Sequence, residues 1–253
     1  MSGASASALP VVEDEARRIA AASPAAPALS VIVPTLEEVT QLPSLLANLE
    51  AARAPGHEVV LVDGGSRDGT LELAGADERP WLRVLSAPRG RAAQLNAGAA
   101  AASGDWLVFL HADTRLSPHS LQRIARLDPD ARWGYSPLRL DAPGLGYRLI
   151  EGGINRRSRR FATPSGDQAL FVRRRLFEAV GGFPPLPFLE DLAFVDRLHA
   201  AQAGPPVRLP EPVLTSARRW QRDGALATVL RMWALRLAYR AGVGATSLAR
   251  FYR

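Results

Sequence analysis

The chain of 253 residues and 27.2 kDa is long enough for one domain built of two halves around a sizeable apolar core. It has no cysteine, which excludes disulfide bonds, thiolate metal sites and cysteine nucleophiles. The net charge is +6, and all of the basic residues are arginines. Codon bias in a GC-rich genome explains this composition. The alternative is a surface that attracts phosphate, anionic lipid or nucleic acid.

The start of the chain is rich in Ala, Ser and Pro. Glu13, Asp14 and Glu15 stand where a secretory signal has basic residues before an apolar core. We therefore predict a disordered tail over residues 1–28 and no signal peptide. Charged residues interrupt every apolar stretch before it reaches the length of a membrane span, so we expect a cytoplasmic protein without one.

Apolar runs alternate with helical patterns in the first half of the chain. Strands are predicted over residues 29–33, 58–63 and 82–85 and from residue 105 to just before Asp113, with helices over 42–53 and after residue 91. This alternation predicts a parallel sheet with right-handed crossovers, whose strands share one crevice at their carboxyl ends. The residues expected at that crevice are Thr35, Asp63, Arg91 and Asp113.

The second half mixes helices with short strands. Helices are predicted over residues 117–127, 144–160, 188–200 and 224–241, and strands over 133–140, 169–172, 207–209 and 213–216. The last helix carries apolar residues at helical spacing, and we expect it to pack in the core. These residues are Leu226, Val229, Leu230, Trp233, Leu237 and Tyr239. Its arginines leave a second interpretation open, a helix lying on anionic lipid.

Several motifs occur in the order typical of one family. They are Val33-Pro34-Thr35, Val62-Asp63-Gly64-Gly65-Ser66-Arg67-Asp68-Gly69-Thr70, His111-Ala112-Asp113 and Glu190-Asp191. Over residues 29–220 the chain thereby resembles the family 2 glycosyltransferases. Segments 89–98, 166–168 and 216–220 are similar to a small bacterial subgroup, some of whose members are associated with arsenosugar biosynthesis.

The resemblance implies the GT-A fold, an α/β fold with an open, mostly parallel sheet and helices on both faces. It divides the glycosyltransferase domain, residues 29–222, into a Rossmann-like nucleotide-sugar half (29–116) and an acceptor half (117–222), followed by an amphipathic helical segment (223–253). The implied activity is transfer of a sugar from a nucleoside diphosphate sugar, with UDP favoured, to an unknown acceptor hydroxyl. It would be metal-dependent, inverting and non-processive.

The resemblance also implies a donor site. Its residues are Pro34, Thr35, Glu38, Asp63, Gly65, Arg91, Ala112 and Asp113. Asp63 would accept a hydrogen bond from the base, with a turn-forming role as its alternative. Arg91 would face the diphosphate, with a plain surface arginine as the alternative. The chain departs from the family at Glu37-Glu38, where Asn followed by Glu is usual.

Asp113 is the implied metal ligand, for Mn²⁺ or Mg²⁺, with diphosphate oxygens completing the coordination shell. His111 stands where the family has an acid, so the site has one negative charge fewer. A neutral imidazole can still ligate Mn²⁺. The alternative for His111 is a structural role at a strand end.

Asp191 is the implied general base, with Glu190 as its substitute; two acids that merely begin a helix are the alternative. Arg218, Arg219 and Trp220 resemble part of the Gln-x-x-Arg-Trp motif of processive relatives, and would contact diphosphate and sugar. Acceptor contact and loop formation are equal alternatives for the remaining motif, which comprises Gly166, Asp167 and Gln168.

The sequence leaves the acceptor open. Arginine clusters at residues 156–160 and 173–175 favour an anionic or lipid-linked acceptor and leave peripheral contact with the inner membrane face open; no nucleic acid partner is expected. A nucleotidyltransferase on a similar sheet is one alternative, but the acidic segment 33–37 lacks the lysine-bearing glycine loop expected there. A non-catalytic basic module that binds membrane or nucleic acid is the other, and it would show steep salt dependence.

Overall fold

The computed structural model describes residues 29–52 and 56–252, and the predicted tail lies outside this part of the chain. The strands are β1 Leu29–Thr35, β2 His57–Asp63, β3 Leu82–Ser86, β4 Trp106–Phe109, β5 Thr114–Arg115, β6 Trp133–Tyr135, β7 Leu138–Asp141, β8 Leu170–Arg173, β9 Val207–Arg208 and β10 Val213–Ser216. The helices are α2 Leu42–Ala51, α3 Thr70–Gly75, α4 Arg91–Ala101, α5 Ser120–Ala125, α6 Leu145–Phe161, α7 Arg174–Ala179, α8 Glu190–Ala200, α9 Arg218–Asp223, α10 Ala225–Arg240 and α11 Ala245–Tyr252, with a 3₁₀ turn η1 at Gly166–Gln168.

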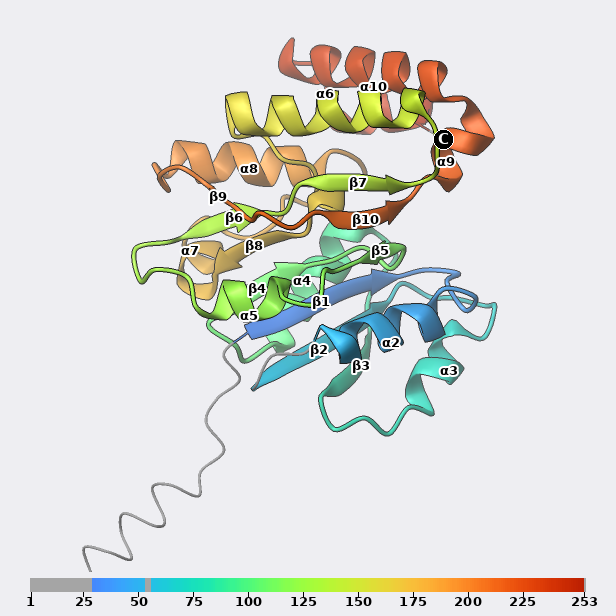
Figure 1. Cartoon of the computed structure of the whole chain (residues 1–253), viewed down its shortest axis with the longest axis vertical. Helices are drawn as coiled ribbons and strands as arrows, with labels where there is room; N and C mark the ends of the chain where they lie inside the picture. Colours follow the sequence, from blue (N-terminus) through green and yellow to red (C-terminus); the bar gives the residue numbers. More distant parts are fainter. Residues whose placement is uncertain (1–28, 53–55, 253) are drawn as a thin grey trace, which may run out of the picture.

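The main sheet has seven strands in the order β3-β2-β1-β4-β8-β6-β9 (Figure 1). Its first four strands are parallel, because β1 pairs in parallel with both β2 and β4, and β2 with β3. Successive β1 residues face opposite sides of the sheet. Val31 and Val33 pack in a cluster with α2 and α5, and Ile32 packs in a cluster with α4, α7 and α8. The predicted mostly parallel sheet with helices on both faces is confirmed.

The second half adds antiparallel strands and a second sheet. β8 lies antiparallel to both β4 and β6, and β5, β10 and β7 form a separate three-stranded sheet that α6 covers. The prediction of one strand over residues 133–140 is wrong, because β6 and β7 belong to different sheets. Pro137 has no N–H to donate to a strand ladder, so the chain leaves the main sheet between Tyr135 and Leu138.

The C-terminal helices pack on the start of α8. Leu235 of α10 and Leu248 of α11 are buried against Phe188, Leu189 and Leu192. The expectation that the apolar residues of the last predicted helix, which is α10, pack in the core is wrong for most of them. Four of its side chains are exposed, namely Leu226, Leu230, Trp233 and Leu237. Helical spacing identifies an apolar face but does not say what covers it.

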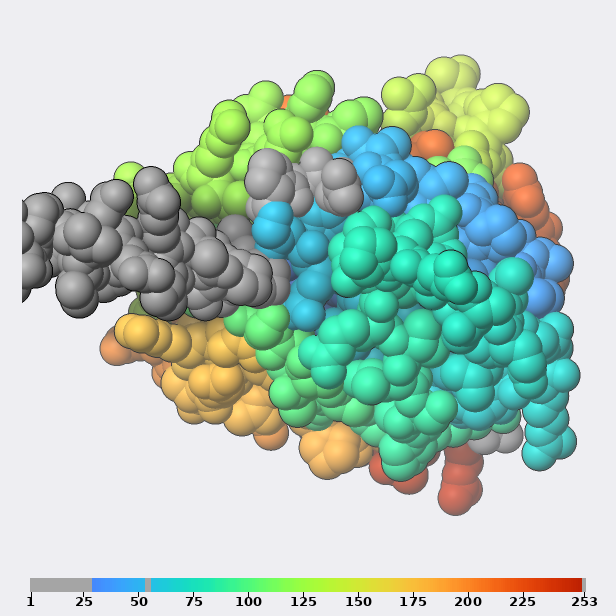
Figure 2. All heavy atoms as spheres, turned by 90° about the horizontal axis from the view of Figure 1, so that it is seen from below, coloured from blue at the N-terminus to red at the C-terminus, as the bar shows by residue number. Residues whose placement is uncertain are grey.

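The C-terminal helices lie on the side of the molecule opposite the β3 edge. α6 and α10 form the outermost layer in Figure 1, beyond α8 and the small sheet. Seen from below in Figure 2, blue-green segments of the first half make up most of the face, and the red C-terminal segments appear only at its margin. No helix in residues 29–52 and 56–252 is long and apolar enough to cross a bilayer.

Close packing of α4 on the sheet generates a first prediction. A Cβ on Gly98 of α4 would lie 2.5 Å from Cγ2 of Ile32 and 3.0 Å from Cγ2 of Val62. We expect Gly98→Ala to lower the free energy of unfolding in urea by about 1–2 kcal/mol, because the clash exceeds the gain in helix propensity. Gly152→Ala in α6 is the matched control, since its Cβ would meet no atom within 4 Å. It should stabilise by up to about 1 kcal/mol; equal effects would contradict this account of α4 packing.

Candidate functional site

The first two strands end side by side at the predicted crevice. The last residues of β1 and β2, Thr35 and Asp63, are paired in register. Gln94 of α4 donates from Nε2 to the carbonyl oxygens of Thr35 and Val62, at 2.8 Å each. One buried amide therefore holds the carboxyl ends of both strands against α4.

Asp63 organises the loop that follows β2. Its Oδ2 accepts hydrogen bonds from the N–H groups of Gly65 (2.8 Å) and Ser66 (2.9 Å), and its Oδ1 accepts one from the Ser66 hydroxyl at 2.5 Å. Gly65, at the exposed tip, has φ +89°, which favours glycine. These contacts show the turn-forming role that was the alternative for Asp63, and a role in reading the base stays a prediction.

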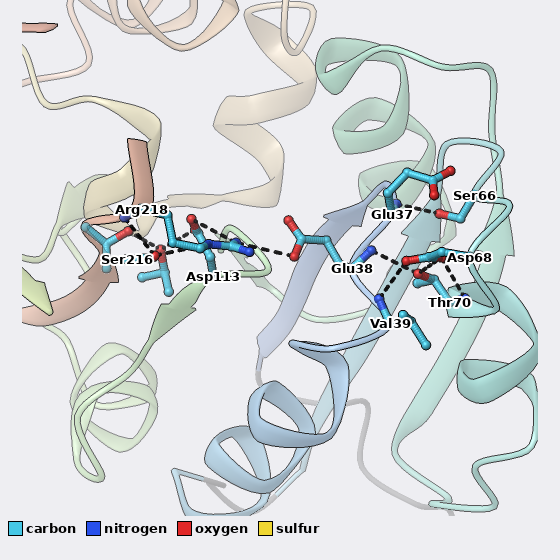
Figure 3. A network of polar contacts seen from close by, with 11 residues as sticks. Glu37, Glu38, Val39, Ser66, Asp68, Thr70, Asp113, Ser216 and Arg218 are labelled. Atoms are coloured by element: carbon cyan, nitrogen blue, oxygen red, sulfur yellow. Dashed lines mark hydrogen bonds and ion pairs between the residues drawn. The ribbon is translucent and has the colours of Figure 1, made fainter. Parts of the chain in front are cut away.

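The loop after β1 is tied to the loop after β2 (Figure 3). Three successive backbone N–H groups of one loop donate to side chains of the other. The pairs are Glu37 to Ser66 Oγ (2.9 Å), Glu38 to Thr70 Oγ1 (2.9 Å) and Val39 to Asp68 Oδ2 (3.0 Å). These bonds join the two loops into one wall of the crevice. The Glu38 side chain points from this wall toward Asp113 and Arg218.

Arg218 lies between the carboxylates of Glu38 and Asp113. Its Nη2 lies 3.4 Å from Oε2 of Glu38 and 3.6 Å from Oδ2 of Asp113. Burial raises the pKa of Glu38, Arg218 opposes that rise, and Asp113 adds to it. Ser216 accepts from Arg218 Nε at 3.2 Å. Ser216, which occupies the position of the glutamine in the Gln-x-x-Arg-Trp motif of processive relatives, therefore orients the arginine.

His111 lies between the Asp113 loop and the predicted base. A Cβ on Gly166 would lie 3.0 Å from Nε2 of His111 and 3.5 Å from Cβ of Asp191, so both side chains lie beside Gly166. Burial, followed by the charge of Arg91, lowers the pKa of His111 to about 4. The imidazole is therefore neutral at neutral pH, which is the form that can accept a hydrogen bond or ligate a metal.

Asp191 is fixed by backbone donors at the start of α8. Its Oδ2 accepts from the Gly166 N–H and its Oδ1 from the Leu192 N–H, both at 2.7 Å. Burial raises the pKa of Asp191, but Arg236, the Gly166 N–H and Arg91 together outweigh burial, and the net pKa is lowered. Asp191 is therefore a carboxylate at neutral pH, with a fixed orientation.

Glu190, the other predicted candidate for the base, is buried and bonded to an arginine. Its Oε1 lies 3.1 Å from Nη1 of Arg91, the first residue of α4. Burial raises the pKa of Glu190 more than Arg91 lowers it. The pair links the first turns of α4 and α8 across the crevice, and it places a guanidinium beside the predicted diphosphate position.

Two arginines that the sequence did not single out one by one lie on the acceptor side. Arg157 of α6, from the cluster at residues 156–160, and Arg236 of α10 both act electrostatically on Asp191, and the buried Nε of each has no hydrogen-bond partner among the described residues. Burial, followed by the charge of Arg236, lowers the pKa of Arg157 to about 10. Asp167, from the predicted acceptor motif, also acts on Arg157. The sequence signals were the arginine cluster at residues 156–160 for Arg157 and the arginine content of the last helix for Arg236.

The remaining predicted residues divide by exposure. Gln168 is buried, and its Oε1 accepts from Ser158 Oγ at 2.7 Å and the Ser165 N–H at 3.1 Å, so its contacts favour the loop-forming alternative. Trp220 is half-buried against the small sheet. The remaining predicted positions are Pro34, which is half-buried, Ala112, which is buried, and Arg219, which is exposed and acts electrostatically on His111.

The donor set around Asp113 fits a divalent cation that is bound together with a diphosphate. In the described part of the chain, no three His, Asp or Glu side chains converge in a way that could hold a metal ion. Mg²⁺ and Mn²⁺ are commonly held by one or two carboxylates with phosphate oxygens supplying further ligands. The half-buried Asp113 carboxylate and the neutral imidazole of His111 are suited to that arrangement.

A separate open cleft lies between β6 and the C-terminal ends of α6 and α8. It has a volume of about 580 Å³ and is lined by residues that include Tyr135, Arg159, Arg160, His199 and Arg208. None of its lining residues is among the predicted site residues.

Two solved structures share the fold. S. aureus TarS 1–349 in complex with UDP superposes with a TM-score of 0.60 at 21% identity, over 74% of this chain and 60% of that one. The mannosyltransferase PcManGT from Pyrobaculum calidifontis, in complex with GDP-Man and Mn²⁺, superposes with a TM-score of 0.54 at 22% identity, over 82% and 64%. The architecture is therefore the GT-A-like α/β fold that the motifs predicted.

Sequence comparisons relate the chain to glycosyltransferases. Residues 30–130 match the model of Glycosyl transferase family 2. An uncharacterized glycosyltransferase of Haemophilus influenzae is 24% identical over 195 residues, 73% of this chain and 66% of that protein. A PGL/p-HBAD biosynthesis glycosyltransferase of Mycobacterium tuberculosis is 32% identical over 178 residues, 63% of this chain and 64% of that protein. The chain thus spans slightly less than two thirds of these relatives.

The contacts of Asp63 generate a second prediction. Asp63→Ala leaves two backbone N–H groups and a hydroxyl without their acceptor, and we expect the free energy of unfolding to fall by about 2 kcal/mol or more. Asp141→Ala is the control, because that side chain is 58% exposed and lies 3.7 Å from Arg115. It should change stability by less than about 0.5 kcal/mol. Equal losses in urea unfolding would show that Asp63 does not hold the loop.

Proposed function

We propose that the protein transfers a sugar from a nucleoside diphosphate sugar, with UDP as the nucleotide, to an acceptor hydroxyl. The observation that carries this proposal is that Asp113, Asp191 and Arg91 all act electrostatically on His111 near the carboxyl edge of the parallel strands, where Gly166 donates its N–H to Asp191. The match to the family model and the fold of the neighbours, one solved with UDP and one with GDP-Man and Mn²⁺, support it.

The donor would lie along the wall formed by the two tied loops. Thr35, Asp63 and Glu38 would face the base and ribose, as the resemblance implies, and the diphosphate would extend toward Asp113. When bound there, a divalent cation would neutralise negative charge on the diphosphate. Arg91 and Arg218 would add positive charge on the protein side. Arg218 would then exchange its contacts with Glu38 and Asp113 for contacts with phosphate oxygens.

Asp191 would act as the general base. It would accept the proton of the acceptor hydroxyl as the hydroxyl oxygen forms its bond to the anomeric carbon. The bond between that carbon and the phosphate oxygen breaks, and its electron pair leaves with the nucleoside diphosphate. Attack on the face opposite the leaving group inverts the anomeric centre. Glu190 would keep Arg91 in position rather than take the proton, because its Oε1 is bonded to that guanidinium.

Arg157 and Arg236 support the expectation of an anionic acceptor. Both lie near Asp191 on the acceptor side, and neither Nε has a hydrogen-bond partner in the part of the chain that the structure describes. A carboxylate or phosphate on the acceptor would pair with these groups. The link to arsenosugar biosynthesis and a cytoplasmic location stay predictions that rest on the sequence alone.

A thermal unfolding experiment tests the donor site. Wild type and Asp113→Asn would be unfolded with Mn²⁺ and a panel of nucleotides and nucleotide sugars. A ligand at about a hundred times its Kd adds roughly 2.7 kcal/mol, a rise in Tm on the order of 5–10 °C for a chain of this size. We expect that rise to need both Mn²⁺ and a uridine nucleotide, and to disappear in Asp113→Asn.

The exposed Asp130→Asn is the control for this experiment and should keep the full rise. A rise that persists in Asp113→Asn would contradict the role of Asp113. No rise with any nucleotide, together with salt-sensitive binding to nucleic acid, would favour the basic binding module instead.

The proposed base is tested separately from donor binding. Asp191→Asn should keep the thermal shift with Mn²⁺ and nucleotide, because Asn can still accept one of the two backbone hydrogen bonds. It should lower the rate at which the nucleoside diphosphate is released from the donor identified above by about 10²–10⁴-fold. Glu190→Gln, read in the same assay, should weaken donor binding through Arg91 instead. Unchanged release by Asp191→Asn would rule out Asp191 as the base.

A further inference from the structure

Exposed apolar side chains are concentrated on one part of the surface. Among the described residues ten large apolar side chains are exposed, and nine of them lie within residues 145–161 or 226–251. The tenth, Leu73, lies on α3, at the opposite end of the molecule in Figure 1. Soluble domains rarely expose apolar groups in such a concentration unless the surface binds something.

Four of these side chains form one stripe on α10. They are Leu226, Leu230, Trp233 and Leu237, with exposed fractions between 60% and 73%. Their spacing of four, three and four residues puts them on one side of the helix, over a length of about 17 Å. Thr228 and Leu235, on the other side of α10, are buried. The stripe therefore points away from the protein.

α6 continues this surface beside α10. The two helices are in contact and run along the same outer side of the molecule (Figure 1). Leu145 and Leu149 of α6 are 82% and 77% exposed, and the exposed Arg156 lies on the same side of the helix two turns later. We call the stripe on α10 together with Leu145, Leu149 and Arg156 the α6/α10 face.

Positive charge predominates in this region. Residues 224–253 contain five arginines and no Asp or Glu, and two of these arginines pair with acids outside this range, Arg231 with Asp223 at 2.6 Å and Arg240 with Asp196 at 3.7 Å. α6 contains five arginines and one acid, Glu151, which is buried, accepts a hydrogen bond from the Leu140 N–H at 2.6 Å and pairs with Arg148 at 2.9 Å. The α6/α10 face therefore combines large apolar groups with positive charge and presents no acidic side chain.

We propose that the α6/α10 face docks on a membrane that contains anionic phospholipid. The leucines and Trp233 would insert at the boundary between headgroups and acyl chains, and the arginines would contact lipid phosphates. The face consists of neighbouring helices with protruding side chains, and a fluid bilayer adapts to such a surface. A second copy of the chain would bring the same predominantly cationic face against this one, so that like charges would oppose each other.

Docking through the α6/α10 face has a consequence for the proposed reaction, and this consequence rests on the proposed function. The sides of α6 and α10 that face inward carry Arg157 and Arg236, which act on Asp191. The same two helices would then contact the bilayer on one side and line the acceptor crevice on the other. The acceptor would accordingly be a lipid-borne or surface-bound anion rather than a freely diffusing one.

Vesicle sedimentation tests the docking itself, whether or not the protein transfers sugar. The full chain would be centrifuged with vesicles of phosphatidylcholine alone and with vesicles that also contain phosphatidylglycerol. We expect binding to the anionic vesicles only, weakened as salt shortens the Debye length from about 10 Å to about 3 Å. Leu230→Ser combined with Leu237→Ser should weaken it at least tenfold. Leu73→Ser, an exposed leucine outside this face, is the control and should bind as wild type does.

Tryptophan fluorescence reports which face makes the contact. Trp233 is 71% exposed, whereas Trp81, Trp106 and Trp133 are buried and Trp220 is half-buried. Anionic vesicles should therefore shift the emission of wild type to shorter wavelength and leave that of Trp233→Phe in place. Absence of vesicle binding, or equal binding by the double leucine variant, would overturn the proposal. Self-association in analytical ultracentrifugation that the double variant abolishes would assign the face to a second copy instead.

Discussion

The parallel pairing of β1 with both β2 and β4 is the constraint on which the rest of this molecule depends. Because the three strands run the same way, the loops after residues 35, 63 and 109 all leave the sheet at one edge. Gln94 then fixes the position of that edge, because it donates hydrogen bonds to carbonyl oxygens at the ends of β1 and β2. The sheet brings residues far apart in the chain to this edge, where pairs such as Arg218 with Glu38 and Arg91 with Glu190 form.

Carboxylates and arginines alternate along the crevice, and this alternation keeps it ready for an anionic ligand. Arg218 lies between Glu38 and Asp113, and Arg91 is bonded to Glu190. Each guanidinium is held by a carboxylate before any phosphate arrives, so a diphosphate would meet arginines whose orientation is already set. On the acceptor side the roles are reversed, because there a carboxylate, Asp191, lies near arginines from α6 and α10.

The sequence predicted the first half of the fold and the edge of the crevice because local patterns determine both. Buried parallel strands are short apolar runs, and the residues just after them must lie at the carboxyl edge, as Thr35 and Asp63 do. The sequence marked Arg157 only as part of an arginine cluster and did not place Arg236 at the site, because only the packing of α6 and α10 near the start of α8 brings both residues to Asp191. The exposure of Trp233 was missed for a related reason, since spacing shows a face but not its cover.

Locating a bound metal and nucleotide tests the central claim most directly, which is that the crevice beside Asp113 binds the donor diphosphate. Crystals grown with UDP and Mn²⁺ would be measured at the manganese absorption edge. The account predicts one anomalous peak about 2–2.5 Å from a carboxylate oxygen of Asp113, with diphosphate oxygens around it and the uracil beside the Asp63 loop. A nucleotide in the separate cleft lined by Tyr135 and Arg208, or manganese away from Asp113, would contradict it.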